Sequence, residues 1–273
     1  MMIIIPKRVK FIAYSAVVFA ICGWFYIFNL GVLQSLFFVL ATGILVASYF
    51  FLFKSYGRIK ENYTYFLYWV LLNFCLMYMP NYFLQINLVA KILYLFLACT
   101  ILYLNALALN VYIVAKNKNQ PIPLLQTSKL VVSTSIVLAA IIGSVIILKS
   151  SFAFENPFYN FLAQMFYFSF FYFGLISNTE WFYLSEKIGE VISPRFLNDF
   201  KSIKFFMAFS LTTVSLLLAF FQLEDLAKGI IIGILYYIFI DLKTHYLNRS
   251  LNNRFIRESI IIFVLVCVLV NFF

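Results

Sequence analysis

Apolar runs long enough to cross a lipid bilayer recur along almost the whole chain, separated by short polar connections. A membrane-spanning helix needs about 20 mainly apolar residues. The segments that pass this test are Val9–Phe28, Gly31–Phe53, Tyr63–Met79, Leu88–Ala115, Leu130–Leu148, Phe158–Ser177, Phe205–Leu223, Ala227–Leu242 and Ile256–Phe273. The pattern predicts one all-α integral membrane domain over residues 1–273, a polytopic transmembrane helical bundle of about nine spans. Its last two spans are short or end in charges, so each crosses fully or only in part.

The composition leads to the same class of protein. Hydrophobic residues make up 64% of the chain and charged residues 11%, whereas a soluble domain has about 45–50% and about 25%. A water-soluble fold of 273 residues has too little interior to bury this much apolar surface. Lipid removes the problem, because it solvates apolar side chains.

Lysine and arginine residues collect in alternate connections between the predicted spans. With the N-terminus in the cytoplasm, 17 of the 20 basic residues fall on the cytoplasmic side, and Lys91, Lys149 and Lys228 are the exceptions. The 17 are Lys7, Arg8, Lys10, Lys54, Arg58, Lys60, Lys116, Lys118, Lys129, Lys187, Arg195, Lys201, Lys204, Lys243, Arg249, Arg254 and Arg257. Short cytoplasmic loops retain positive charge, so this pattern predicts a cytoplasmic N-terminus. The apolar run 11–28 is expected to remain as an uncleaved first span.

The net charge of +10 follows from this topology and gives no reason to expect a nucleic-acid partner. Anionic lipid head groups attract a positive cytoplasmic face by about 1 kcal/mol for each nearby Lys or Arg. The expected partners are therefore membrane lipids at that face, together with protein subunits if the chain belongs to a larger assembly.

The connection after the sixth predicted span has a helical pattern of its own. Trp181, Leu184, Ile188 and Val191 recur at three- and four-residue spacing. Either residues 180–192 form a cytoplasmic amphipathic helix at head-group level, or the sixth span continues out of the membrane. Glu180 is then either an N-terminal helix charge or a proton or cation ligand near the membrane boundary.

Small residues spaced four apart predict close helix packing in three spans. Gly229 and Gly233 share a face of the eighth span, Gly43 pairs with Ala47 in the second, and Gly143 pairs with Ala139 in the fifth. Such faces let helix backbones approach closely in lipid. We expect most of them to serve packing within the chain, with dimerisation as the alternative.

Polar residues inside spans are the default functional candidates in a membrane protein. Lys91 lies about one turn inside the fourth span, so it either snorkels to the outer head groups or pairs with an acidic residue. The acidic candidates are Glu155, Glu224 and Asp225. Four amides are expected to form interhelical hydrogen bonds of about 1 kcal/mol each. They are Asn73, Asn105, Asn110 and Gln164.

Asp241, His245 and Arg249 follow one another at four-residue spacing, so they share a face if the eighth helix extends into the cytoplasm. A carboxylate beside an imidazole can perform acid–base chemistry, and an arginine can bind phosphate. The alternative is a charged helix end outside the membrane with no chemical role.

The sequence gives no reason to expect a metal or an organic cofactor. His245 is the only histidine, which excludes histidine-rich metal boxes. The four cysteines, Cys22, Cys75, Cys99 and Cys267, lie singly within apolar runs, as buried thiols do. The sequence contains no H-E-x-x-H, no P-loop and no G-x-S-x-G motif.

The stretch Asn110-Val-Tyr-Ile-Val-Ala, followed by Pro121-Ile-Pro-Leu-Leu-Gln126 and an apolar span, resembles a group of bacterial proteins. These are multi-spanning membrane proteins of unknown function from small-genome, candidate-phylum bacteria. The resemblance covers about a third of the chain, and Gln126 replaces the usual basic residue. It implies a bacterial inner membrane and carries over no activity, cofactor or site residue.

Two functional hypotheses follow. The first is a non-enzymatic membrane component, transport-like or lipid-interacting, or a subunit of a membrane assembly. The alternative is a membrane-embedded transferase or hydrolase that acts on a lipid phosphate through Asp241, His245 and Arg249. An enzyme requires the imidazole within hydrogen-bond reach of the carboxylate, and the structure can test this.

Overall fold

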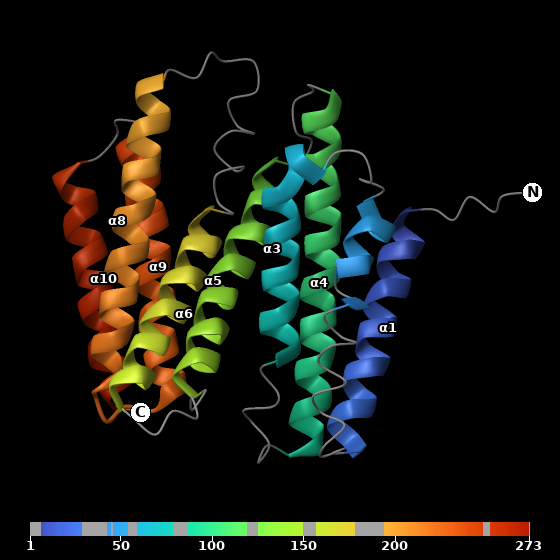
Figure 1. Ribbon diagram of the computed structural model, residues 1–273, viewed down its shortest axis with the longest axis horizontal. Coiled ribbons are helices and arrows are strands. Elements are labelled where there is room, and N and C mark those ends of the chain that lie inside the picture. The colour runs from blue at the N-terminus through green and yellow to red at the C-terminus, as the bar shows by residue number, and fades with distance from the viewer. Residues whose placement is uncertain are drawn as a thin grey trace, which may run out of the picture. The chain divides into compact units, whose positions relative to one another are not determined.

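The computed structural model describes residues 7–28, 43–44, 46–53, 59–78, 87–118, 125–149, 157–177, 194–247 and 252–272. All regular secondary structure in these ranges is α-helical (Figure 1), which confirms the all-α prediction for them. The helices are α1 (Lys7–Phe28), α3 (Ile59–Tyr78), α4 (Leu88–Lys118), α5 (Leu125–Lys149), α6 (Pro157–Ser177), α8 (Pro194–Ala219), α9 (Asp225–Leu247) and α10 (Asn253–Phe272). The amphipathic segment 180–192 and most of the second predicted span lie outside the described residues.

Three of the described helices are long and apolar enough to cross a membrane. Their spanning portions are Leu88–Val114, Gln126–Lys149 and Asp199–Ala219, and Tyr63–Met77 is a shorter apolar helix. An α-helix satisfies its backbone hydrogen bonds internally, which a bilayer interior requires. The chain therefore contains helices compatible with a membrane protein.

Large apolar side chains are exposed along two of these helices, α4 and α8. On α8, Phe205, Phe206 and Phe209 are 63%, 68% and 73% exposed. Contiguous apolar patches of this kind are rare on soluble monomers and are the normal surface of a lipid-facing helix.

Helices α8 and α9 extend further than the apolar runs that predict them. α8 begins at Pro194, well before the predicted span start at Phe205, and α9 continues to Leu247, past Leu242. Proline is favoured in the first helical turn, where its missing N–H leaves no bond unmade. The apolar pattern marks the part of a helix that suits lipid, while the helix itself continues through polar residues.

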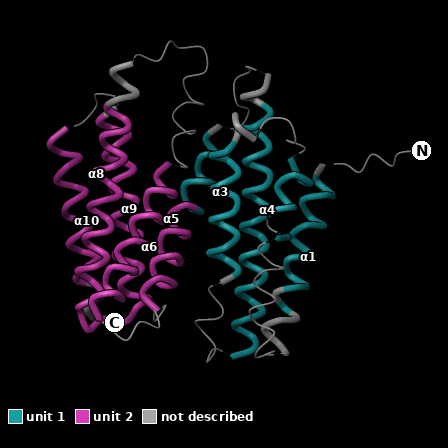
Figure 2. The backbone as a smooth tube through the Cα atoms, viewed as in Figure 1, with its two compact units in different colours: residues 1–135, 181–188 teal, residues 136–180, 189–273 magenta. Residues whose placement is uncertain are grey.

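The described chain groups into two compact units (Figure 2). Unit 1 holds residues 1–135 and 181–188, unit 2 holds residues 136–180 and 189–273, and the boundary falls within α5. In unit 1, α4 packs against α1 and α3. In unit 2, α8 packs against α6 and α9, and α9 packs against α10. The single membrane domain stays a prediction.

Small residues allow close packing in unit 2. A Cβ atom on Gly229 would lie 2.6 Å from Val145 Cγ2 and 3.0 Å from the backbone oxygen of Ile141, so α9 approaches α5 closely there. A Cβ on Gly233 would overlap the Ile141 side chain, and one on Gly143 would overlap the Phe171 ring. A Cβ on Gly43 would meet no atom within 4 Å.

Candidate functional site

A buried chain of hydrogen bonds links three helices in unit 1. The Tyr68 hydroxyl on α3 donates to Asn105 Oδ1 on α4 at 2.5 Å. Asn105 Nδ2 donates in turn to Ser135 Oγ on α5 at 2.7 Å and to the carbonyl of Ile101 at 2.8 Å. All three linked side chains are buried. The amide of Asn105 therefore holds α3, α4 and α5 in one register.

Helix α3 carries two more such links. The Tyr14 hydroxyl on α1 donates to Asn73 Oδ1 at 2.7 Å, and Asn73 Nδ2 donates to the Trp69 carbonyl at 2.8 Å. The Trp69 indole N–H donates to Ser48 Oγ at 3.1 Å. The interhelical bonds predicted for Asn73 and Asn105 are confirmed. Their side-chain partners on other helices are Tyr14, Tyr68 and Ser135, which the sequence did not single out.

Unit 2 has a corresponding set of three hydroxyl groups. Tyr172 OH on α6 lies 2.9 Å from Ser144 Oγ on α5 and 2.6 Å from Ser215 Oγ on α8. All three side chains are buried. A tyrosine well inside an apolar span, away from the interface where tyrosine normally collects, is the feature of the sequence that points to such a bond.

These buried groups are neutral and bond to one another. Their geometry suits them to fixing helix positions, because a bonded hydroxyl or amide offers little capacity to a further ligand. Among the described residues, no group of three or more His, Cys, Asp or Glu side chains could hold a metal ion.

The structure describes Lys91 and two of its possible acidic partners, Glu224 and Asp225. Lys91 lies in the first turn of α4, partly exposed, and its backbone N–H donates to the Asn87 carbonyl at 3.1 Å. Asp225 forms an ion pair with Lys228 of its own helix at 3.4 Å. Glu180, like Glu155, lies outside the described residues. The interhelical bond proposed for Gln164 stays a prediction.

Asp241 and His245 do share a face of α9, because that helix continues to Leu247. Their closest side-chain atoms, Asp241 Oδ1 and His245 Nε2, are 3.9 Å apart, and both side chains are about a third exposed or more. This separation is longer than a hydrogen bond. The imidazole instead packs on the Phe255 ring of α10, with ring centroids 4.2 Å apart. Arg249 lies outside the described residues.

Basic side chains gather around aromatic rings in unit 2. Lys243 on α9 is only 2% exposed, and its Nζ lies 3.9 Å from the centroid of the Phe200 ring on α8. Lys204 Nζ on α8 lies 4.7 Å from the centroid of the Phe173 ring on α6. The face of an aromatic ring attracts a cation, so both rings help to fix the positions of these ammonium groups.

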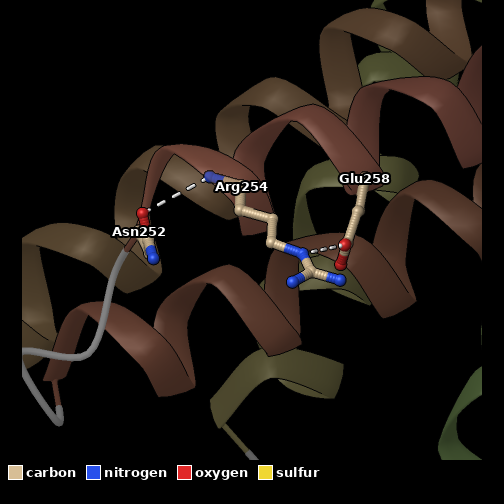
Figure 3. Close-up of polar contacts among 3 residues, drawn as sticks. All are labelled: Asn252, Arg254 and Glu258. Atoms are coloured by element: carbon tan, nitrogen blue, oxygen red, sulfur yellow. Dashed lines mark hydrogen bonds and ion pairs between the residues drawn. The ribbon is translucent and has the colours of Figure 1, made fainter.

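The start of α10 adds an exposed charge pair (Figure 3). Arg254 Nε donates to Glu258 Oε1 at 2.8 Å, one turn along the helix. The Arg254 backbone N–H donates to Asn252 Oδ1 at 3.5 Å, where Asn252 caps the helix. The hydrogen bond to Glu258 raises the pKa of the Arg254 guanidinium.

Comparison of the chain with protein-family models, with curated proteins and with solved structures gives no match.

Proposed function

We propose that this chain is a multi-pass protein of the bacterial cytoplasmic membrane, with nine spans and a cytoplasmic N-terminus. We propose further that it acts without catalysis, as a lipid-interacting component of the membrane or of an assembly within it. The exposed layer of large apolar side chains on its helices carries this proposal, because lipid is the solvent that such a surface requires.

Two further features support the lipid-interacting role over the other hypotheses. The buried side chains linked to Asn105 in unit 1 and to Tyr172 in unit 2 bond to one another, which leaves them little capacity to coordinate a solute in transit. The 3.9 Å separation of Asp241 and His245 gives no support to acid–base catalysis on a lipid phosphate.

Cysteine accessibility tests the topology. In a background with the four native cysteines replaced by alanine, single cysteines are placed at Asn87, Ser202, Gln222 and Asn252, all of which are exposed. A membrane-impermeant maleimide added to intact spheroplasts should label positions 87 and 222 and spare positions 202 and 252 until the membrane is opened. Labelling of positions 202 and 222 from the same side would overturn the proposed arrangement.

Lipid selectivity tests the role. The purified full chain is placed in nanodiscs of phosphatidylglycerol or of phosphatidylcholine, and its thermal unfolding is measured. Binding of the native state to anionic lipid should raise the unfolding temperature in phosphatidylglycerol. Equal unfolding temperatures in the two lipids, measured at low salt, would contradict a lipid-interacting role.

A further inference from the structure

Two lysines stand at the point where α8 enters its apolar run. Lys201 is exposed, Lys204 is partly exposed, and Phe205 follows immediately. Residues three apart lie on the same side of a helix, so Lys201 and Lys204 lie on one side of α8. The Asp199 carboxylate, also on α8, is rotated about 140–160° from the two lysines at about 100° per residue and so lies on the far side of α8.

The contact between α6 and α8 fixes this surface. Lys204 Nζ lies 4.7 Å from the Phe173 ring centroid, and the same ring lies 5.2 Å from that of Phe205. The ring of Phe173 therefore orients a cation and also packs against the apolar start of α8. A lysine stem held in this way loses less conformational freedom when it binds an anion.

A buried hydroxyl points to a ligand at the same place. Ser177 follows Phe173 by one turn on the same side of α6. Its side chain is 9% exposed, and its Oγ has no hydrogen-bond partner among the described residues. Buried hydroxyls are almost always bonded. A phosphate oxygen beside Lys204 would accept this missing bond.

The surface next to the lysines suits acyl chains. On α8, Phe205 is 63% exposed, and on α6 Phe166 and Phe170 are 67% and 71% exposed. The two α6 rings stack with centroids 6.4 Å apart. Cations at the end of an extended aromatic surface match a molecule with a negative head and apolar tails.

We propose that Lys201, Lys204 and Ser177 form a head-group site for an anionic phospholipid on the α6–α8 surface, with its acyl chains over Phe170 and Phe205. The phosphate lies between the two ammonium groups, and the Ser177 hydroxyl donates to it. The site rests on the proposed lipid-interacting function and makes it specific. The site requires that Lys204 lie at the edge of the hydrocarbon core of the bilayer. The orientation of the chain in the membrane determines only which leaflet the bound lipid comes from.

Native mass spectrometry of the detergent-solubilised full chain tests the site. The protein is titrated with dioleoylphosphatidylglycerol, with dioleoylphosphatidylcholine and with inorganic phosphate. The first phosphatidylglycerol should bind selectively. Because each basic residue near an anionic lipid adds about 1 kcal/mol, K201Q/K204Q should weaken this binding about 25-fold. Inorganic phosphate that binds as tightly as the lipid would overturn the assignment to a lipid.

The variant R8Q/K129Q is the matched control. It removes the same charge from two exposed residues of unit 1 that the proposed topology assigns to the same membrane face. Its affinity for the first phosphatidylglycerol should stay within about twofold of the unaltered chain, because neither residue belongs to the site. If the two double variants lose the same affinity for phosphatidylglycerol, the lipid is attracted by the overall positive charge and the specific site is overturned, while the proposed lipid-interacting function stands. If the unaltered chain binds phosphatidylglycerol no more tightly than phosphatidylcholine, both the site and the lipid-interacting function are overturned.

Ser177→Ala provides a second measurement that does not depend on charge. If the hydroxyl donates to the phosphate, S177A weakens phosphatidylglycerol binding several-fold while thermal stability without added lipid is unchanged or higher, because a buried unbonded group is removed. Unchanged lipid affinity in S177A would show that the hydroxyl takes no part and would overturn the three-residue site.

Discussion

Single buried polar side chains set the positions of helices in both units. In lipid there is no hydrophobic force between helices, because lipid tails are as apolar as leucine. A hydrogen bond such as that between Tyr68 and Asn105 is therefore one of the few interactions that favours one helix register over another. The polar residues Asn73 and Asn105 were predictable as bond formers, since an amide in an apolar span needs a partner. The identity of the partner was not.

Asn105→Leu should lower the free energy of unfolding by about 2 kcal/mol, because it leaves the buried Tyr68 hydroxyl and the Ser135 hydroxyl without this partner. Tyr68→Phe should cost about 1 kcal/mol. Unfolding by SDS in mixed micelles measures both, and the double variant completes a cycle. The coupling energy should fall near about 0.6–1.7 kcal/mol, the range of membrane hydrogen bonds. Strict additivity would show that the two side chains act independently.

Tyr172→Phe tests the hydroxyl group of unit 2. It removes one atom that lies within bonding distance of both Ser144 and Ser215, so the expected loss is about 1 kcal/mol of unfolding free energy. Tyr167→Phe is the control, because Tyr167 lies on the same helix and is 50% exposed. The control should stay within about 0.5 kcal/mol. Equal effects of the two substitutions would mean that the buried bonds contribute nothing measurable.

At the scale of the helices, small residues decide how closely two elements approach. The four-residue spacing of Gly229 and Gly233 predicts a close-packing face, and the structure places both against Ile141 of α5. The same type of pattern at Gly43 has no atom within 4 Å of the added Cβ. The same spacing of small residues therefore leads to close packing at Gly229 and Gly233 but not at Gly43. The reason is that tertiary packing, not the local sequence, determines which helix lies against a given face.

Gly229→Ala and Gly43→Ala form a matched pair that tests this difference. Alanine is favoured over glycine in a helix by about 1 kcal/mol, so Gly43→Ala should be neutral or stabilising. At Gly229 the new methyl group meets a backbone oxygen at 3.0 Å that cannot rotate away, and overpacking of this kind costs about 1–3 kcal/mol. Thermal unfolding in detergent compares the two. A Gly229→Ala variant as stable as Gly43→Ala would show that α9 is free to move away from α5.

The bounds of the helices show which part of an element a pattern detects. For α1, α4 and α6 the apolar run and the helix nearly coincide, because polar loop residues begin where the helix ends. For α8 they differ, since residues 194–204 continue the helix with charged residues that the apolar-run criterion does not select. This extension carries Lys201 and Lys204, so the two lysines of the candidate head-group site lay outside the predicted span.

At the scale of the whole molecule, charge distribution and helix packing describe different things. Basic residues predict on which side of the membrane each connection lies, whereas packing places a boundary between two compact units after residue 135, within helix α5. The distribution of Lys and Arg does not predict the boundary between the two units, because that distribution is counted in the connections between helices and not in the helix contacts.

Neutralising the N-terminal basic residues tests how topology is distributed over the chain. The variant K7Q/R8Q/K10Q leaves fourteen basic residues in the predicted cytoplasmic segments. Because the summed Lys and Arg bias of the short loops sets orientation, a cysteine at Ser202 should remain shielded from an impermeant maleimide. If position 202 becomes accessible from outside, the first span alone determines the orientation.

The sequence by itself determined the helical class and the places where helices suit a bilayer. The reason is local: a bilayer-spanning segment must be apolar and must satisfy its own backbone hydrogen bonds, so each span is readable from about 20 consecutive residues. Only the tertiary structure decided that Asn105 meets Tyr68 and Ser135, that Tyr172 meets Ser144 and Ser215, and that Lys204 lies over Phe173. These partners come from different helices, and in lipid an apolar face gives no indication of which helix will cover it.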